Sequence, residues 1–279
     1  MAIPIINGWR SYYPVANEGL GSSYERMVLN KLLLELYKTN KYHNALESPC
    51  FGFTGISGIN LVALAQAGCT VYLEDHEPER IELIKASWQK LNLELQIRCN
   101  PGYRKLDYPD QALDFAFNFS AMWFVEDLAD FISELCRVVR EHILICVPNR
   151  SGLGYKGQLK GYSASKYPQL RLAHIDPQSI IWYMQKYGWR LLKQDYIDCP
   201  PWPDIGMPKE EYLRSFCGKK VLVESKPIDP DKALSIMPYY LGQDPYFATR
   251  MMRFHTFEQF APNCFKHFWA HHRYMLFAK

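Results

Sequence analysis

The sequence lacks the features of a membrane, secreted or nucleic-acid-binding protein. Its longest apolar runs, such as residues 142–148, are far shorter than the ~20 residues that cross a bilayer. Residues 1–6 have no basic region and no long apolar stretch, so no secretory signal is expected. The 32 Lys and Arg nearly balance the 29 Asp and Glu, and they form no basic cluster. We therefore expect no membrane and no nucleic-acid partner.

No two of the eight cysteines have the CxxC spacing of a zinc clip. Several lie in apolar runs, as Cys146 does, which is typical of small buried hydrophobic residues. Without a secretory signal, the sequence predicts free thiols in a cytoplasmic protein. His267 and His271 have the spacing of a helical metal pair, but no HExxH motif accompanies them. No metal site is expected.

Two common catalytic motifs are missing from the sequence, and a third is missing from the glycine turn at residues 52–58. There is no GxSxG of an α/β-hydrolase and no GxxxxGK of a P-loop enzyme. A nicotinamide dehydrogenase would need GxGxxG, and Gly52, Phe53 and Thr54 do not begin one. These absences argue against hydrolase, kinase and dehydrogenase chemistry.

Aromatic residues are abundant, with 19 Tyr, 15 Phe and 7 Trp. They gather near the N-terminus and after residue 155. Such residues suit a binding pocket with one apolar and one polar side, and they equally suit a core of large side chains. The first alternative would favour a flat or apolar small molecule as ligand.

Hydrophobic periodicity alternates between strands and helices. The predicted strands are residues 42–47, 70–73, 95–99, 113–119, 142–147, 189–195 and 273–278. The predicted helices are residues 23–39, 59–67, 79–91, 128–140 and 176–187. Ser22 or Ser23 is the expected N-cap of the first helix. This order predicts a doubly wound α/β sheet with right-handed crossovers.

We expect a single domain with four parts. Residues 1–40 would form a lid and a helix, and residues 41–200 the cofactor-binding core. Residues 204–268 carry proline punctuation without a clean period, which indicates an insertion or a substrate-side region. Residues 269–279 would form the last strand.

A glycine-rich turn follows the first predicted strand. Gly52, Gly55 and Gly58 lie between that strand and a helix, where glycine permits positive φ and the close approach of a cofactor. The same glycines could serve only helix–sheet packing. Glu74 and Asp75 end the next strand, where a carboxylate can accept the ribose hydroxyls of a nucleotide. Strand alternation points the two carboxylates in opposite directions, so the choice between them stays open.

These features together resemble the class I S-adenosylmethionine-dependent methyltransferases. Glu47, Gly52, Thr54 and Gly55 match the acidic residue and glycine turn of that family. Its later motifs are similar to residues 106–114, 134–139, 147–149 and 271–278. The resemblance implies a Rossmann-like, seven-stranded, mostly parallel sheet with an antiparallel last strand. It also implies S-adenosyl-L-methionine as cofactor.

The resemblance assigns expected roles to particular residues. The expected cofactor-binding residues are Glu47, Gly52, Thr54, Gly55, Gly58, Glu74, Asp75, Asn118, Tyr24 and Arg26. The acceptor, expected to be a small molecule, would lie beyond the fourth and fifth strands. Candidates for contact with it are Asn118, Ser120, Trp123 and Asn149, and His255 is a candidate proton acceptor. Tyr12 and Tyr13 would help to close the site.

Three positions depart from the family pattern. Pro49 stands where a glycine is common, and Arg140 begins a stretch that replaces a Pro-Gly-Gly turn. Gly102 replaces an Asp that contacts adenine, which leaves Asn100 or Tyr103 for that contact. A non-catalytic methyltransferase-like binding or scaffold protein is therefore the alternative.

Overall fold

The computed structural model describes residues 9–15, 18–51, 55–159, 162–201 and 234–279. Its strands are β1 (Asn44–Glu47), β2 (Thr70–Asp75), β3 (Gln96–Cys99), β4 (Leu113–Phe119), β5 (Val139–Pro148), β6 (Arg190–Ile197) and β7 (His272–Ala278). They form one sheet in the order β3-β2-β1-β4-β5-β7-β6, and β7 runs antiparallel to both neighbours. The expected seven-stranded, mostly parallel, Rossmann-like sheet is confirmed.

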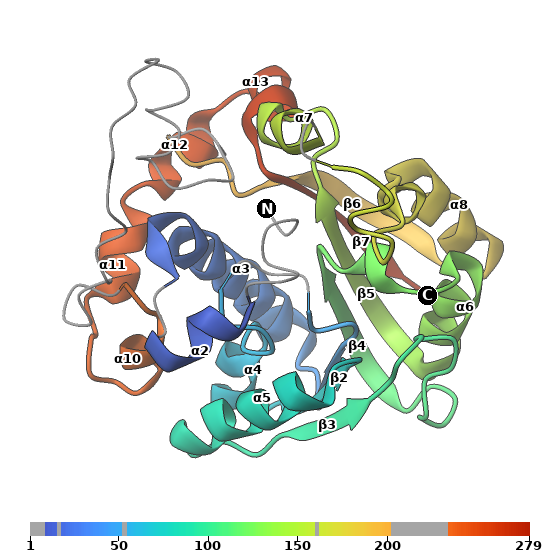
Figure 1. Ribbon diagram of the computed structural model, residues 1–279, viewed down its shortest axis with the longest axis horizontal. Helices are drawn as coiled ribbons and strands as arrows, with labels where there is room; N and C mark the ends of the chain where they lie inside the picture. The colour runs from blue at the N-terminus through green and yellow to red at the C-terminus, as the bar shows by residue number, and fades with distance from the viewer. Residues whose placement is uncertain (1–8, 16–17, 52–54, 160–161, 202–233) are drawn as a thin grey trace.

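Helices cover both faces of this sheet (Figure 1). The main helices are α3 (Gly19–Asn40), α4 (Val62–Gln66), α5 (Pro78–Lys90), α6 (Leu128–Val138) and α8 (Pro177–Lys186). Helices α3, α4 and α5 lie on one face, and α6 and α8 lie on the other. All seven residues of β4 are buried, which explains why this central strand reads as an apolar run.

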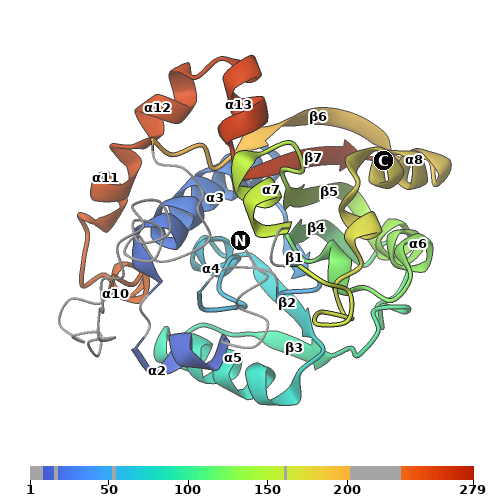
Figure 2. The ribbon, with the colours of Figure 1, turned by 45° about the horizontal axis from the view of Figure 1, so that its top comes forward.

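Shorter helices complete the described chain. They are η1 (Trp9–Ser11), α2 (Tyr12–Val15), η2 (Met122–Phe124), α7 (Leu153–Leu159), η3 (Leu172–Ile175), α10 (Met237–Tyr240), α11 (Phe247–Met252), α12 (His255–Phe260) and α13 (Asn263–Trp269). Helix α11 packs on α3, and α13 lies beside α7 (Figure 2). The predicted insertion at 204–268 therefore contains helices where it is described, and residues 202–233 lie outside the described part. No helix in the described ranges is both long and apolar enough to span a membrane.

The first long helix begins earlier than its sequence pattern suggests. The N-cap of α3 is Glu18, and it makes no side-chain capping hydrogen bond. Ser22 and Ser23 lie inside the helix and are buried, so the predicted serine cap is wrong. Tertiary packing accounts for the difference, because residues 22–30 of α3 are all buried and lack the apolar period of a surface helix.

Two of the stretches that resemble the family motifs, residues 106–114 and 134–139, are hydrogen-bonded to each other. Arg137 donates from Nη1 to the carbonyl of Tyr108 at 2.9 Å and from Nη2 to that of Leu106 at 2.8 Å. The amide of Leu106 donates to Glu134 at 2.9 Å. These residues therefore connect α6 to the loop before β4, and their role in the fold is structural.

Gly58 allows α5 to pack tightly on the turn after β1. Its φ is +73°, and a Cβ added there would lie 2.7 Å from Cδ1 of Ile84 on α5. The Trp88 indole donates to the carbonyl of Gly58 at 2.7 Å, which fixes the same contact. The alternative that this glycine serves helix packing thus has direct support, whether or not a cofactor also approaches it.

Substitution Gly58→Ala is expected to destabilise the protein more than Gly242→Ala. Both glycines have a φ of +73°, but a Cβ at Gly242 meets no atom within 4 Å. The shared backbone strain costs about 1 kcal/mol, and the clash with Ile84 adds about 1–3 kcal/mol. Urea unfolding of the two variants measures the difference. Equal losses of unfolding free energy would contradict the packing role.

Candidate active site

The carboxyl ends of β1, β2 and β4 meet where the strand order reverses, which is the usual ligand position in a doubly wound sheet. Glu47 ends β1, Asp75 ends β2, and Asn118 is the last residue but one of β4. Asn118 donates from Nδ2 to the carbonyl of Ser48 at 2.8 Å, which ties β4 to the loop after β1. We call the buried polar residues here the switch-point site: Glu18, Arg26, Glu47, Asn60, Asp75 and Arg80.

One half of the switch-point site is a hydrogen-bonded chain that starts on α3. The Arg26 guanidinium pairs with Glu18 and donates to Asn60 Oδ1 at 2.6 Å and to the carbonyl of Ile56 at 2.8 Å. Asn60 in turn donates to Glu47 Oε1 at 2.6 Å. The four polar side chains are buried. Arg26 and Glu47, which the sequence predicts as cofactor ligands, are thus brought together through Asn60.

The other half is an ion pair that the sequence analysis missed. Arg80 on the first turn of α5 donates from Nε to Asp75 Oδ2 at 2.7 Å, and its Nη2 pairs with Oδ1. Its guanidinium lies 3.6 Å from the ring centre of Phe51 and 5.0 Å from that of Trp9. Arg10 pairs with the exposed Glu79, so the N-terminal segment lies over this ion pair. An arginine five residues after the acidic strand end was the signal available in the sequence.

Glu74 faces a different set of partners from Asp75, as strand alternation predicts. Glu74 Oε2 accepts from Ser48 Oγ at 2.9 Å and from Asn100 Nδ2 at 3.0 Å. The Tyr103 hydroxyl is 2.9 Å from Nδ1 of His76. Each of these candidate adenosine ligands therefore has a partner within the protein, and the choice between Glu74 and Asp75 as ribose ligand stays a prediction.

The switch-point site and Glu74 together carry more acidic than basic groups. Among the described residues, Glu18 pairs with Arg26 and Asp75 with Arg80, while Glu47 and Glu74 are hydrogen-bonded to neutral partners. Burial raises the pKa of Glu47 to about 8 and that of Glu74 to about 7. Among the described residues, neither Glu18 Oε2 nor Glu47 Oε2 has a hydrogen-bond partner. Glu47 is therefore largely protonated at pH 7, and a cation bound beside it would favour its ionised form.

A side chain of the protein, that of Glu18, packs against the glycine turn at Gly55. A Cβ added to Gly55, whose φ is +115°, would lie 2.5 Å from Glu18 Oε1. The glycine thus makes room for a carboxylate from the segment before α3, at the place where the sequence predicts a cofactor. Gly52 and Thr54 lie outside the described residues.

The acceptor-side candidates differ in how far their polar groups are used. Asn118 and Asn149 are occupied by backbone contacts, the latter through Nδ2 with the carbonyl of Ala270 at 2.8 Å. Ser120 Oγ and Trp123 Nε1 are buried without a hydrogen-bond partner among the described residues. Ser120 also has a φ of +49°, which is unusual for a residue other than glycine. Ser120 and Trp123 are therefore better placed than the two asparagines to receive a ligand.

Two of the remaining candidates, His255 and Tyr24, contact Glu258 on helix α12. His255 Nε2 lies 3.0 Å from Lys31 Nζ, and its Nδ1 lies 3.7 Å from Glu258. Tyr24 donates to Glu258 Oε2 at 2.7 Å. His255 and Tyr24 thus share a partner on α12, away from the switch-point contacts. Tyr13 reaches the glycine turn, with its hydroxyl 3.4 Å from the carbonyl of Ser57.

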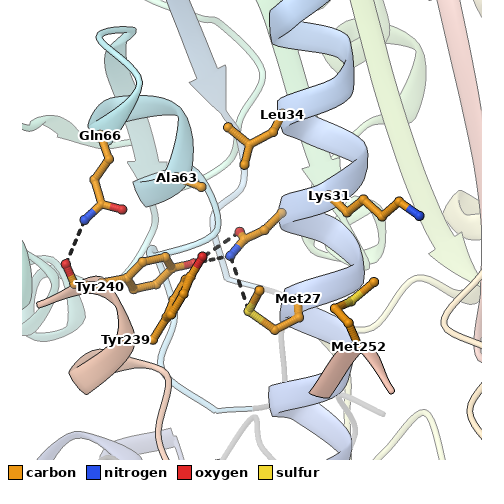
Figure 3. Close-up of a pocket in the computed structure, with 9 residues that line it drawn as sticks. Met27, Lys31, Leu34, Ala63, Gln66, Tyr239, Tyr240 and Met252 are labelled. Carbon is orange, nitrogen blue, oxygen red and sulfur yellow. Dashed lines mark hydrogen bonds between the residues drawn. The ribbon is translucent and has the colours of Figure 1, made fainter. Parts of the chain in front are cut away.

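A hollow of about 230 Å³ lies between α3 and α10 (Figure 3). Asn30 Nδ2 donates to the Tyr240 hydroxyl at 2.9 Å across it, and Gln66 donates to the carbonyl of Tyr240 at 2.8 Å. It is smaller than the roughly 300 Å³ from which ligand sites usually start. Its polar groups are already paired, so it is a weaker candidate than the switch-point site.

A comparison with known protein families finds one match in this chain. Residues 53–146, about one third of the chain, match a family model described as a methyltransferase domain. No curated protein matches the chain in sequence. Residues 53–146 therefore resemble a methyltransferase domain, and the resemblance expected from the sequence motifs is confirmed.

Many solved structures share the fold at low sequence identity. A protein from Galdieria sulphuraria assigned as a sarcosine dimethylglycine methyltransferase is 10% identical with a TM-score of 0.52. The alignment covers 90% of this chain and 84% of that protein. The YcgJ protein of Bacillus subtilis is 11% identical with a TM-score of 0.50, and the alignment covers 90% and 97% of the two chains. The cyclase SpnF is 12% identical with a TM-score of 0.51, covering 90% and 80%. At these identities the likeness concerns the fold alone.

Substitution Glu47→Gln is expected to change how stability depends on pH. Because the pKa of Glu47 is raised to about 8 in the folded protein, the folded state holds a proton that the unfolded state releases near pH 4.5. The stability of the parent protein therefore falls between about pH 5 and 8, and the Gln variant lacks this contribution. Relative to the parent, the variant should gain roughly 3.5 kcal/mol between pH 5 and pH 8.

Urea unfolding of both proteins at pH 5 and pH 8 measures this difference. Glu82→Gln is the matched control, because Glu82 is exposed and paired only with Lys85. An unchanged difference between Glu47→Gln and the parent at the two pH values would show that the carboxyl is not held neutral by burial.

Proposed function

We propose that the protein is an S-adenosylmethionine-dependent methyltransferase that acts on a small-molecule acceptor. The observation that carries this proposal is the excess of buried carboxylates at the switch point, with free oxygens on Glu18 and Glu47. S-adenosylmethionine has a sulfonium and an ammonium against one carboxylate, so its net positive charge complements such a site. The methyltransferase-domain match supports the same ligand.

The described residues fit this cofactor at one end and not at the other. Glu18 and Glu47 would hold its cationic end, and when bound it supplies a methyl group already activated by the sulfonium. At the ribose end, Asp75 is engaged by Arg80 under Phe51 and Trp9. Binding there requires Arg80 to release Asp75. The protein's own task is to position the acceptor and exclude water, with Ser120 as the candidate contact.

A non-catalytic binding protein is the second candidate, and the Asp75–Arg80 pair favours it. Arg80 occupies Asp75, which is one of the two candidate ribose ligands. Glu18 lies against Gly55, where a cofactor would approach the glycine turn. The fold does not decide the reaction either, since a structure described as a cyclase shares it. Ligand binding separates the two candidates.

Calorimetric titration with S-adenosylmethionine and S-adenosylhomocysteine tests the proposal. We expect micromolar binding of the parent protein and a loss of at least about tenfold in Asp75→Ala, which corresponds to about 1.4 kcal/mol. Arg80→Met should bind more tightly than the parent, because it frees Asp75 while keeping an apolar stem against Phe51. Absence of binding at millimolar concentration in both the parent and Arg80→Met, each shown to be folded by thermal melting, would favour the non-catalytic candidate.

The affinity for S-adenosylmethionine should also rise with pH. With pKa values of about 8 for Glu47 and about 7 for Glu74, both carboxyls are mostly neutral at pH 6.5 and must ionise to attract a cation. Binding should tighten by about tenfold between pH 6.5 and 8. S-adenosylhomocysteine, which lacks the sulfonium charge, should respond less, and Glu47→Gln should flatten the profile. Titrations across this range that give a constant affinity would count against an electrostatic role for Glu47.

A further inference from the structure

A second polar cluster is buried at the same edge of the sheet and has no part in the proposed cofactor site. It consists of Glu25 on α3, Asp198 directly after β6, and His272 at the start of β7. Glu25 Oε1 lies 2.7 Å from His272 Nδ1, which lies 3.8 Å from Asp198 Oδ2. One ligand atom from each residue falls within 4.8 Å of the others.

The three side chains are almost completely shielded from water, with exposed fractions of 7%, 3% and 8% for Glu25, Asp198 and His272. Glu25 Oε1 and His272 Nδ1 form the 2.7 Å ion pair with each other, and neither these atoms nor Asp198 Oδ1 makes a hydrogen bond with any further described residue. Burying two carboxylates without full compensation is costly. Two buried carboxyl groups thus share the His272 imidazole, with one ligand atom from each residue within 4.8 Å of the others, which forms a compact donor set for a cation.

We propose that Glu25, Asp198 and His272 bind a divalent transition-metal ion of the Zn²⁺ or Mn²⁺ kind. A mixed set of imidazole nitrogen and carboxylate oxygen suits these ions better than Mg²⁺ or Ca²⁺, which prefer oxygen alone. Metal–ligand bonds of about 2.1 Å place tetrahedral ligand atoms about 3.3 Å apart. The separations of 2.7 and 3.8 Å lie on either side of that value.

The surroundings of the cluster agree with a metal site. His271 lies with Nδ1 2.6 Å from Asp198 Oδ2, the kind of outer hydrogen bond that orients a ligand carboxylate. The ring of Phe119 packs at 4.5 Å on the ring of His272 and keeps that side apolar. The helical pair considered in the sequence, His267 and His271, is not formed. His267 contacts the Tyr196 hydroxyl at 2.7 Å, while His271 lies after α13 has ended.

Three protein ligands leave coordination positions for water or for an oxygen of a bound molecule. Phe119 ends β4 just before Ser120, so these positions lie near the acceptor-side candidate. A role for the ion in holding an oxygen-bearing acceptor therefore rests on the proposed function. Binding of the ion itself does not.

Metal analysis of the full chain tests the site without cofactor or activity. The EDTA-treated protein is incubated with Zn²⁺ or Mn²⁺, desalted and analysed by mass spectrometry, with Mg²⁺ and Ca²⁺ as comparison ions. We expect about one transition ion per chain and an affinity at least about 100-fold lower in Glu25→Gln and in His272→Gln. The ion should also raise the melting temperature of the parent and not that of either variant.

His267→Gln is the matched control, because it removes a nearby imidazole that the geometry leaves out of the site. Its metal content should equal that of the parent. Metal-free melting curves show which variants are folded, and Asp198→Asn replaces any that is not. A parent protein that takes up no ion and shows no melting shift, an ion retained in both Glu25→Gln and His272→Gln, or loss of the ion in His267→Gln would each overturn the proposal.

Discussion

The burial of the Arg26 guanidinium is the constraint on which the rest of the site depends. The side chain is fully buried, and such a charge is tolerated only when it is paired and hydrogen-bonded. Its partners come from three parts of the chain: Glu18 before α3, Ile56 in the turn after β1, and Asn60 before α4. The requirement to satisfy one guanidinium thus fixes the N-terminal cover, the long helix and the strand–turn–helix unit relative to one another.

The same rule applies at the end of β2 and gives the site its character. Asp75 is buried and is compensated by Arg80, just as Glu18 is compensated by Arg26. Glu47 has only an amide partner, and burial raises its pKa to about 8. The fold therefore places these side chains where doubly wound sheets usually bind their ligands. Arg26 and Arg80 already pair with two of the carboxylates there. Fold likeness at 10–12% identity carries no information on this point.

Most of the architecture could be predicted because it is encoded locally. The apolar run at 113–119 and the helical period near residue 128 need no knowledge of distant residues, and both elements form where expected. The acidic ends of β1 and β2 were found for the same reason. The local pattern could not show that Arg80 turns inward, because an arginine one helical turn after a strand end is compatible with either direction.

Long-range pairing was beyond the sequence for a related reason. Glu25 and His272 come from opposite ends of the chain, and only the antiparallel placement of β7 between β5 and β6 brings them together. The predicted serine cap of α3 is wrong because the helix begins three residues before Ser22, and Glu18 pairs with Arg26 and packs against Gly55 without capping the backbone. In both cases tertiary contacts overrode a plausible local rule.

The first turns of α3 finally connect the two polar sites. Tyr24, Glu25 and Arg26 are consecutive, and successive helical residues point about 100° apart. Tyr24 reaches Glu258, Glu25 reaches His272, and Arg26 reaches the switch-point site. Because all three side chains are buried on one rigid helix, a displacement of that helix at the switch point also moves Glu25. The switch-point site and the proposed metal cluster are therefore mechanically joined through a single helical turn.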